Sequence, residues 1–170
     1  MIFCLKLSKV QRCGSSERVH MTHSYRIHYF HLIWSTKQRI KWINDHLKSQ
    51  LYPYIAGIIK KQGGHLLEIG GMPDHVHLLV ELSNLDKFSY FIRDVKANSS
   101  IWVHKNFPGF SEFAWQEGYG SFSVSYLSLN QARTYIQNQI EHHATMSFEE
   151  EFLKFLKGHK VQYDERFVLG

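Results

Sequence analysis

The chain is poor in the residues that build cross-linked or membrane-embedded proteins. Its 170 residues include only two cysteines and three prolines. Both cysteines, Cys4 and Cys13, lie in the opening segment, so neither a disulfide framework nor a four-ligand zinc site is expected. No apolar run reaches the roughly 18 residues needed to cross a bilayer, and Lys6 interrupts the apolar start before it reaches signal-peptide length. We therefore expect a cytoplasmic protein with no membrane partner.

The composition fits one compact domain that could bind a polyanion. Hydrophobic residues make up 44% of the chain and aromatic residues 15%, which is enough for a substantial core and for stacking surfaces. The formal net charge of +5 suits a nucleic-acid partner. An ordinary basic protein would carry the same charge, so charge alone assigns no function.

Two histidines stand two positions apart in the segment MPDHVHLLV, residues 72–80. In an extended strand alternate side chains share a face, so His75 and His77 would lie side by side while Val76 faces the other way. Neutral imidazole is the commonest metal ligand, and the pair therefore suggests a metal site. A chain with 12 histidines is expected to contain such a pair by chance, so a second element is needed.

That second element is the segment SLNQARTYIQNQIEHH, residues 128–143, which predicts a helix. Ser128 and Gln131 form a capping-box pattern, and apolar positions recur at helical spacing through Ile140 to His143. Tyr135 and Gln139 are four residues apart, so a phenol and a carboxamide would share one helix face. By itself this pattern indicates no more than an amphipathic helix.

The remaining elements predict an α+β fold. We expect a strand over 25–35, a helix from about 47 to 62, strands over 65–69 and 75–82 joined by a longer loop, and a helix capped by Ser83 and Asp86 that extends to about 105. Short strands over 113–115 and 122–124 precede the tyrosine helix. This order predicts a ferredoxin-like, or RRM-like, antiparallel sheet with helices packed on one face.

A C-terminal helical extension is expected after the tyrosine helix. Ser147 and Glu150 form a capping box that opens a helix over 148–157, and Gly158 stands at its end. The run Glu149 to Glu151 resembles a metal cluster only superficially, because successive helical residues face different directions; we interpret it as favourable charge at the helix N-terminus. His142 and His143 are expected at the surface or outside the ligand set.

We divide the chain into three parts. Residues 1–20 are expected to be a leader, either disordered or upstream of a native start at Met21. Residues 21–146 would form the main domain, and residues 147–170 a helix and tail packed on it. No internal repeat or further boundary is visible.

Five motifs, in order, give the chain a specific resemblance to the HUH-type single-tyrosine transposases, and more closely to the transposases associated with repetitive extragenic palindromes (REP-associated tyrosine transposases). The resemblance runs from about Met21 to the C-terminus, where the segment 163–167 also takes part. The resemblance rests on the motifs YFHLIWSTK at 29–37, MPDHVH at 72–77, WQEGYG at 115–120, FSVS at 122–125 and YIQNQ at 135–139.

The resemblance implies a metal-dependent enzyme that cleaves and rejoins single-stranded DNA next to hairpins. Tyr135 would be the nucleophile and would form a 5′-phosphotyrosine intermediate, while His75, His77 and the Gln139 side-chain oxygen would hold Mg²⁺ or Mn²⁺. Because Gln139 stands four residues after Tyr135, a single-tyrosine mechanism is expected. Asp74 would either orient a metal-binding histidine from outside the ligand set or serve as a turn residue after Pro73.

The DNA-binding surface is mapped less sharply. Basic and aromatic residues suited to phosphate contact and base stacking are Lys37, Arg39, Lys41, Trp42, Lys60, Lys61 and Tyr119. Trp115 is expected in the core. The partner implied by the resemblance is single-stranded DNA with hairpin, palindromic elements. A homodimer with the tyrosine acting in trans and a monomer are both compatible with the sequence.

Two other classes of function stay open. A non-catalytic ferredoxin-like nucleic-acid-binding module would need the basic surface but not the histidine and tyrosine motifs together. A metal-dependent nuclease without a covalent intermediate would need the histidines but not Tyr135.

Overall fold

The computed structural model describes residues 25–164. The expected leader, Cys4, Cys13 and Met21 lie outside this range, as does most of the 163–167 segment. The elements are β1 (His28–Ser35), η1 (Lys37–Arg39), α1 (Asp45–Lys61), β2 (His65–Met72), β3 (His75–Leu82), α2 (Phe88–Asn106), η2 (Pro108–Phe110), β4 (Gly120–Ser123), η3 (Tyr126–Ser128), α3 (Leu129–Gln137), α4 (Gln139–His143) and α5 (Phe148–Gly158).

The sheet is the ferredoxin-like one that the sequence predicts. Its four strands lie in the order β2-β3-β1-β4, and every neighbouring pair is antiparallel. β1 and β3 pair along their whole length, from His28 opposite Leu82 to Ser35 opposite His75. β3 is therefore held on both sides by other strands, which fixes the position of every side chain that it carries.

The main core lies between the sheet and the helices α1 and α2. Alternate residues of β3, Val76, Leu78 and Val80, are fully buried against these helices. α1 contributes four buried aliphatic residues at helical spacing, from Leu47 to Ile59. Its Pro53 lies in the helix interior rather than the first turn, but on the exposed side, where the carbonyl that loses its partner can face water.

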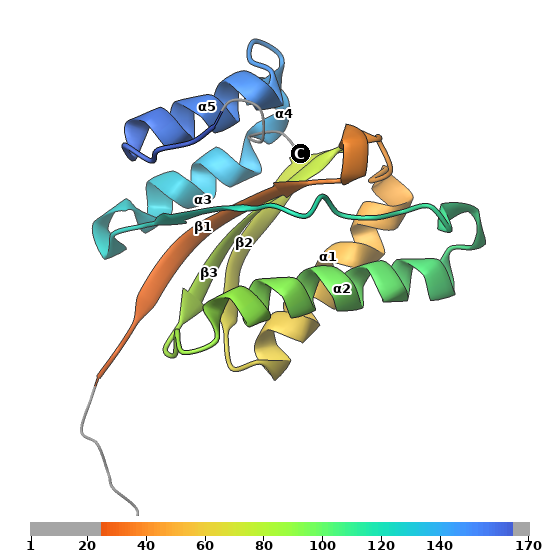
Figure 1. Cartoon of the computed structure of the whole chain (residues 1–170), viewed down its shortest axis with the longest axis horizontal. Helices are drawn as coiled ribbons and strands as arrows, with labels where there is room; N and C mark the ends of the chain where they lie inside the picture. Colours follow the sequence, from red (N-terminus) through yellow and green to blue (C-terminus); the bar gives the residue numbers. More distant parts are fainter. Residues whose placement is uncertain (1–24, 165–170) are drawn as a thin grey trace, which may run out of the picture.

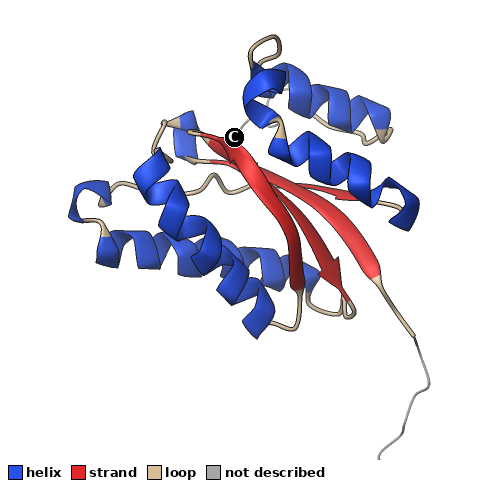
Figure 2. Cartoon of the chain, turned by 180° about the vertical axis from the view of Figure 1, so that it is seen from behind, coloured by secondary structure: helices blue, strands red, loops and turns tan. Residues whose placement is uncertain are grey.

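Helices cover both faces of the sheet, not one. α1 and α2 pack on the first face, whereas α3, α4 and α5 lie across the other (Figures 1 and 2). α5 packs through Phe148, Phe152 and Leu156 against Ile33 of β1 and Phe122 of β4, forming a second hydrophobic cluster. Because the side chains of each strand alternate between the two faces, the second face also carries apolar residues that must be buried. The expected C-terminal extension buries them.

Several predicted boundaries shift. β1 begins at His28 rather than Tyr25, and α2 begins at Phe88 without a side-chain cap, so the expected cap at Ser83 is wrong. The stretch 113–115 forms no strand of its own, only a bridge from Trp115 to Thr36. Trp115 is buried as expected, and its Nε1 donates to Ser99 Oγ.

The hairpin between β2 and β3 is tighter than the expected longer loop. β2 continues through Gly70 and Gly71 to Met72, leaving only Pro73 and Asp74 in the turn. Gly71 has a φ of 145°, a conformation that side-chain-bearing residues rarely adopt. The turn therefore places Asp74 immediately before the two histidines.

Gly70 allows α3 to approach the sheet closely. A Cβ atom at this position would lie 2.2 Å from the carbonyl oxygen of Ile136, on the helix that carries Tyr135. No side chain larger than hydrogen fits unless α3 moves away from β2. The described helices include none that is long and apolar enough to cross a membrane.

We predict that Gly70→Ala lowers the free energy of unfolding by about 1–3 kcal/mol, because the new methyl group meets a backbone carbonyl that cannot rotate away. Gly57→Ala is the matched control: a Cβ atom there meets nothing within 4 Å, and the exchange in α1 should stabilise by roughly 0.5–1 kcal/mol. Urea denaturation of both variants measures the difference. Equal stability of the two variants would contradict the close approach.

Candidate metal and tyrosine site

β3 brings two imidazoles into the buried face beneath α3 and α5. His75 and His77 are 1% and 0% exposed, and they point to the same side of the sheet, as the spacing predicts. Their ring centroids are 5.1 Å apart. Because the strand is central in the sheet, the pair is held on a rigid element.

Each of these rings has its Nδ1 atom engaged. His75 Nδ1 lies 2.8 Å from Asp74 Oδ1, and His77 Nδ1 lies 2.9 Å from Nε2 of His31 on β1. Burial lowers the pKa of His31 to about 3 and that of His77 to about 4, so both rings are neutral at pH 7. The tautomer in which His77 donates from Nδ1 leaves its Nε2 lone pair free. The Nε2 atoms of His75 and His77 are buried without a hydrogen-bond partner.

Asp74 connects His75 to the segment after β1. Its Oδ2 accepts a hydrogen bond from Arg39 at 2.9 Å, and the Arg39 guanidinium also lies over the Phe148 ring. Burial would raise the pKa of this carboxyl, but the His75 hydrogen bond and the Arg39 charge outweigh it and hold the pKa at about 2. Asp74 is thus ionised, and it occupies both positions considered from sequence, in the turn and against His75.

The predicted tyrosine helix is broken into two. Asn138, with φ −95° and ψ 26°, separates α3 from α4, and Ser128 makes no side-chain cap. The break rotates α4 relative to α3, so that Ile140, expected on the apolar face, is 70% exposed. Gln139 is 1% exposed, and its amide donates to the Tyr135 carbonyl at 3.2 Å while its Oε1 has no partner.

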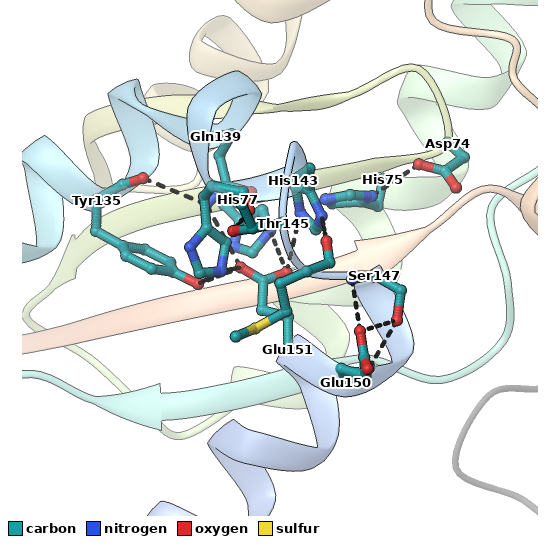
Figure 3. Close-up of polar contacts among 12 residues, drawn as sticks. Asp74, His75, His77, Tyr135, Gln139, His143, Thr145, Ser147, Glu150 and Glu151 are labelled. Carbon is teal, nitrogen blue, oxygen red and sulfur yellow. Dashed lines mark hydrogen bonds and ion pairs between the residues drawn. The ribbon is translucent and has the colours of Figure 1, made fainter.

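α4 and α5 add two groups that were not expected in the site. His143 has Nδ1 bonded to the Met146 carbonyl at 2.8 Å, so its Nε2 faces inward. Glu151 is 1% exposed, and its Oε2 lies 3.3 Å from His143 Nε2 and 3.4 Å from His77 Nε2. Potential ligand atoms of His75, His77, His143 and Glu151 all lie within 4.8 Å of one another (Figure 3).

Five potential metal-binding atoms in this cluster are buried and have no hydrogen-bond partner. They are His75 Nε2, His77 Nε2, His143 Nε2, Gln139 Oε1 and Glu151 Oε2. Buried polar atoms without partners are costly, and they gather in native structures where an ion or ligand completes them. Three imidazoles, a carboxylate and an amide oxygen make a donor set suited to a divalent cation, so the cluster can hold one.

The Tyr135 hydroxyl lies at the edge of this cluster. It donates a short hydrogen bond to Glu151 Oε1 and lies 3.0 Å from His142 Nε2. Burial, followed by the neighbouring Glu151 carboxylate, raises the pKa of the phenol above its usual range. Tyr135 is half-buried and lines two surface hollows, one toward β4 and one toward α5.

The residues considered for DNA binding are spread over the molecule. Lys37 and Lys41 are exposed beside η1, and Lys60 and Lys61 are exposed at the end of α1, on the opposite face from α3 (Figure 1). Arg39 is engaged with Asp74 and Glu149.

The two aromatic candidates for DNA binding lie away from Tyr135. Trp42 packs against Phe110, and Tyr119 lines a hollow beside α2.

The assignment of the glutamate run is corrected in part. Ser147 and Glu150 form the expected capping box, and Glu149 is exposed, but Glu151 points into the site. The sequence carried a signal for this: Glu151 shares a helix face with Phe148 and Phe155, an apolar face where a carboxylate needs a partner. His143 carried a signal as well, because it stands four residues after Gln139 and therefore shares its helix face.

Comparisons of the sequence with known proteins find transposases. Residues 23–139 match the family described as "Transposase IS200 like". The ISDra2 transposase TnpA of Deinococcus radiodurans is 27% identical over 118 residues, which is 69% of this chain and 84% of that protein.

Two solved structures share the fold. The crystal structure of a putative transposase from Deinococcus radiodurans R1 has a TM-score of 0.58 at 25% identity and covers 76% of this chain and 98% of that one. A REP-associated tyrosine transposase bound to a REP hairpin has a TM-score of 0.55 at 15% identity, and the match covers 82% of this chain and 76% of that one. The family match spans the two histidines, the tyrosine and the glutamine, and the chain therefore belongs to the IS200-like, HUH-type single-tyrosine DNA transposases.

Proposed function

We propose that this transposase cleaves and rejoins single-stranded DNA through a covalent link to Tyr135. The observation that carries the proposal is the position of the Tyr135 hydroxyl. Tyr135 lines two surface hollows, and its hydroxyl is joined through the Glu151 carboxylate to a cluster of three imidazoles in the same chain. A phenol placed next to a cation site is the arrangement that nucleophilic attack on a phosphodiester requires.

The reaction conserves the energy of the broken ester. The Tyr135 oxygen forms a bond to phosphorus and releases its proton to solvent, while the bond from phosphorus to the 3′ oxygen breaks and that oxygen takes up a proton. The products are a 5′-phosphotyrosine and a free 3′-hydroxyl. A second 3′-hydroxyl can reverse the exchange and join a different strand, so no external energy source is needed. Only one tyrosine takes part, since Gln139 occupies the position one turn further along.

His75, His77 and Gln139 are the residues that would hold the metal in this scheme. Their buried atoms without partners fit a divalent cation, and Mg²⁺ or Mn²⁺ is the proposed ion. When bound, such an ion polarises the scissile phosphate and stabilises its developing charge. Asp74 orients His75 through the Nδ1 hydrogen bond, as carboxylates do for metal-binding histidines.

The proposed partner is single-stranded DNA that carries hairpin elements. One structural neighbour is a transposase bound to a REP hairpin, and the net charge of +5 suits a polyanion. The hollows beside Tyr135 are lined by aromatic and basic side chains, including Phe155, His159 and Lys154, which suit stacking and phosphate contact. Lys37 and Lys41 would contact the DNA backbone further away.

In this proposal Tyr135 and the metal-binding histidines that assist it belong to the same chain. The contact from Tyr135 through Glu151 to His77 forms within a single chain, so the site needs no second copy. A monomer is therefore the proposed working unit.

The central prediction is that incubation with labelled single-stranded hairpin DNA and Mn²⁺ yields an SDS-resistant protein–DNA adduct, and that Tyr135→Phe abolishes it. The matched control is Tyr90→Phe, an exposed tyrosine on α2. The adduct should persist in the control, because this residue lies on the other face of the sheet. DNA cleavage that continues in Tyr135→Phe without an adduct would favour the nuclease alternative, and binding without cleavage in the wild type would favour the non-catalytic module.

The cis arrangement predicts the behaviour of mixed variants. Tyr135→Phe lacks the nucleophile and His77→Ala lacks a metal-binding ring, so a mixture should form no more adduct than either protein alone. Gel quantification of the adduct at equal concentrations measures this. Recovery of adduct in the mixture would show instead that tyrosine and histidines come from different subunits.

Asp74→Asn should weaken Mn²⁺ binding by about 10–100-fold, the usual effect of removing a carboxylate that orients a metal-binding histidine. Isothermal titration calorimetry gives the dissociation constant. Asp94→Asn is the control, because Asp94 pairs with exposed Arg93 on α2, away from the cluster. Unchanged affinity in Asp74→Asn would leave Asp74 with the role of a turn residue alone.

A further inference from the structure

Glu151 occupies an unusual position for a carboxylate. It lies on the apolar face of α5, between Phe148 and Phe155, and it is 1% exposed. The family match ends at residue 139, so α5 and all of α4 after its first residue lie beyond the matched residues. A buried carboxylate is costly unless something of opposite charge or a hydrogen-bond donor compensates it.

The two oxygens of Glu151 face different groups. Oε1 accepts the hydrogen bond from the Tyr135 hydroxyl, and the Gln139 amide lies 3.5 Å away. This fixes the carboxylate so that Oε2 turns toward the histidines, 3.3 Å from His143 Nε2 and 3.4 Å from His77 Nε2. Oε2 has no hydrogen-bond partner, and Figure 3 shows the Glu151 side chain beside the histidines.

An ordinary hydrogen bond does not explain the contact between Glu151 and His143. His143 Nδ1 faces a backbone carbonyl oxygen, an acceptor, so Nδ1 carries a proton. His143 Nε2 and Glu151 Oε2 are both buried without a hydrogen-bond partner, although they lie only 3.3 Å apart. A divalent cation bound by both atoms would satisfy them.

The same reasoning applies to His75. Its Nδ1 faces the Asp74 carboxylate, and its Nε2 lies in the cluster without a hydrogen-bond partner. The unpartnered atoms of the histidines and the carboxylate thus lie close together.

We propose that Glu151 and His143 are ligands of the metal ion and that the C-terminal helix α5 is part of the metal centre. This rests on the proposed function and extends its ligand set from three protein atoms to five. With three imidazole nitrogens and two oxygens, the centre suits Mn²⁺ or another first-row divalent ion better than Mg²⁺, which prefers oxygen and retains its water. These five atoms would hold the ion, which would polarise a phosphate group of the DNA.

The test compares Mn²⁺ affinity in full-length wild type and Glu151→Gln by isothermal titration calorimetry. The variant keeps the shape of the side chain and removes its charge. We expect binding to weaken by at least about tenfold, the lower end of what even loss of an outer partner of a metal site causes. Glu141→Gln, an exposed carboxylate on α4, is the charge-matched control and should bind as wild type does. Wild-type affinity in Glu151→Gln overturns the inference.

A third variant separates this inference from the proposed function. His75→Ala should lose Mn²⁺ binding under either ligand set. If His75→Ala binds as wild type does, the metal centre of the proposed function fails. If His75→Ala loses binding and Glu151→Gln keeps it, only the role of Glu151 fails.

A measurement on the wild-type protein guards against a variant that does not fold. In crystals grown with Mn²⁺, the anomalous difference map should place the ion within coordination distance of Glu151 Oε2 and His143 Nε2. An ion bound by His75, His77 and Gln139, with water in place of these two atoms, overturns the inference.

Discussion

The hydrogen bonds to the Nδ1 atoms of three buried imidazoles are the constraint on which the rest of the site depends. Asp74, His31 and the Met146 carbonyl hold the rings of His75, His77 and His143. Each bond fixes a ring's orientation and leaves its Nε2 directed at a common point. The three partners come from a turn, a neighbouring strand and a helix-ending loop, so the site exists only when all of these are in place.

The sheet makes this possible by separating two cores. One face of β3 builds the main hydrophobic core with α1 and α2, which fixes the strand. The other face would be exposed if α3, α4 and α5 did not cover it, and a histidine exposed to water would have no fixed orientation. The small cluster around Phe122, Phe152 and Leu156 holds α5 in place and thereby buries Glu151. Hydrophobic packing on this face therefore serves the geometry of the polar site.

The break at Asn138 lies between the tyrosine and the two residues that α4 places in the cluster. α3 places Tyr135 at the edge of the site, beside two surface hollows. α4 turns Gln139 and His143 inward. Gly70 supports the arrangement, since its missing side chain lets α3 lie against β2 at the level of Ile136.

Local periodicity and short motifs were enough to predict the succession of strands and helices, the side-by-side histidines of β3 and the capping box at Ser147. Tyr135 and Gln139 were identified from sequence through resemblance. The membership of His143 and Glu151 in the same cluster, and the cover of helices on both faces of the sheet, emerged only from the folded chain. A residue's direction after a helix break, and the partner of a buried carboxylate, depend on contacts between segments far apart in the sequence, and no local pattern records such contacts.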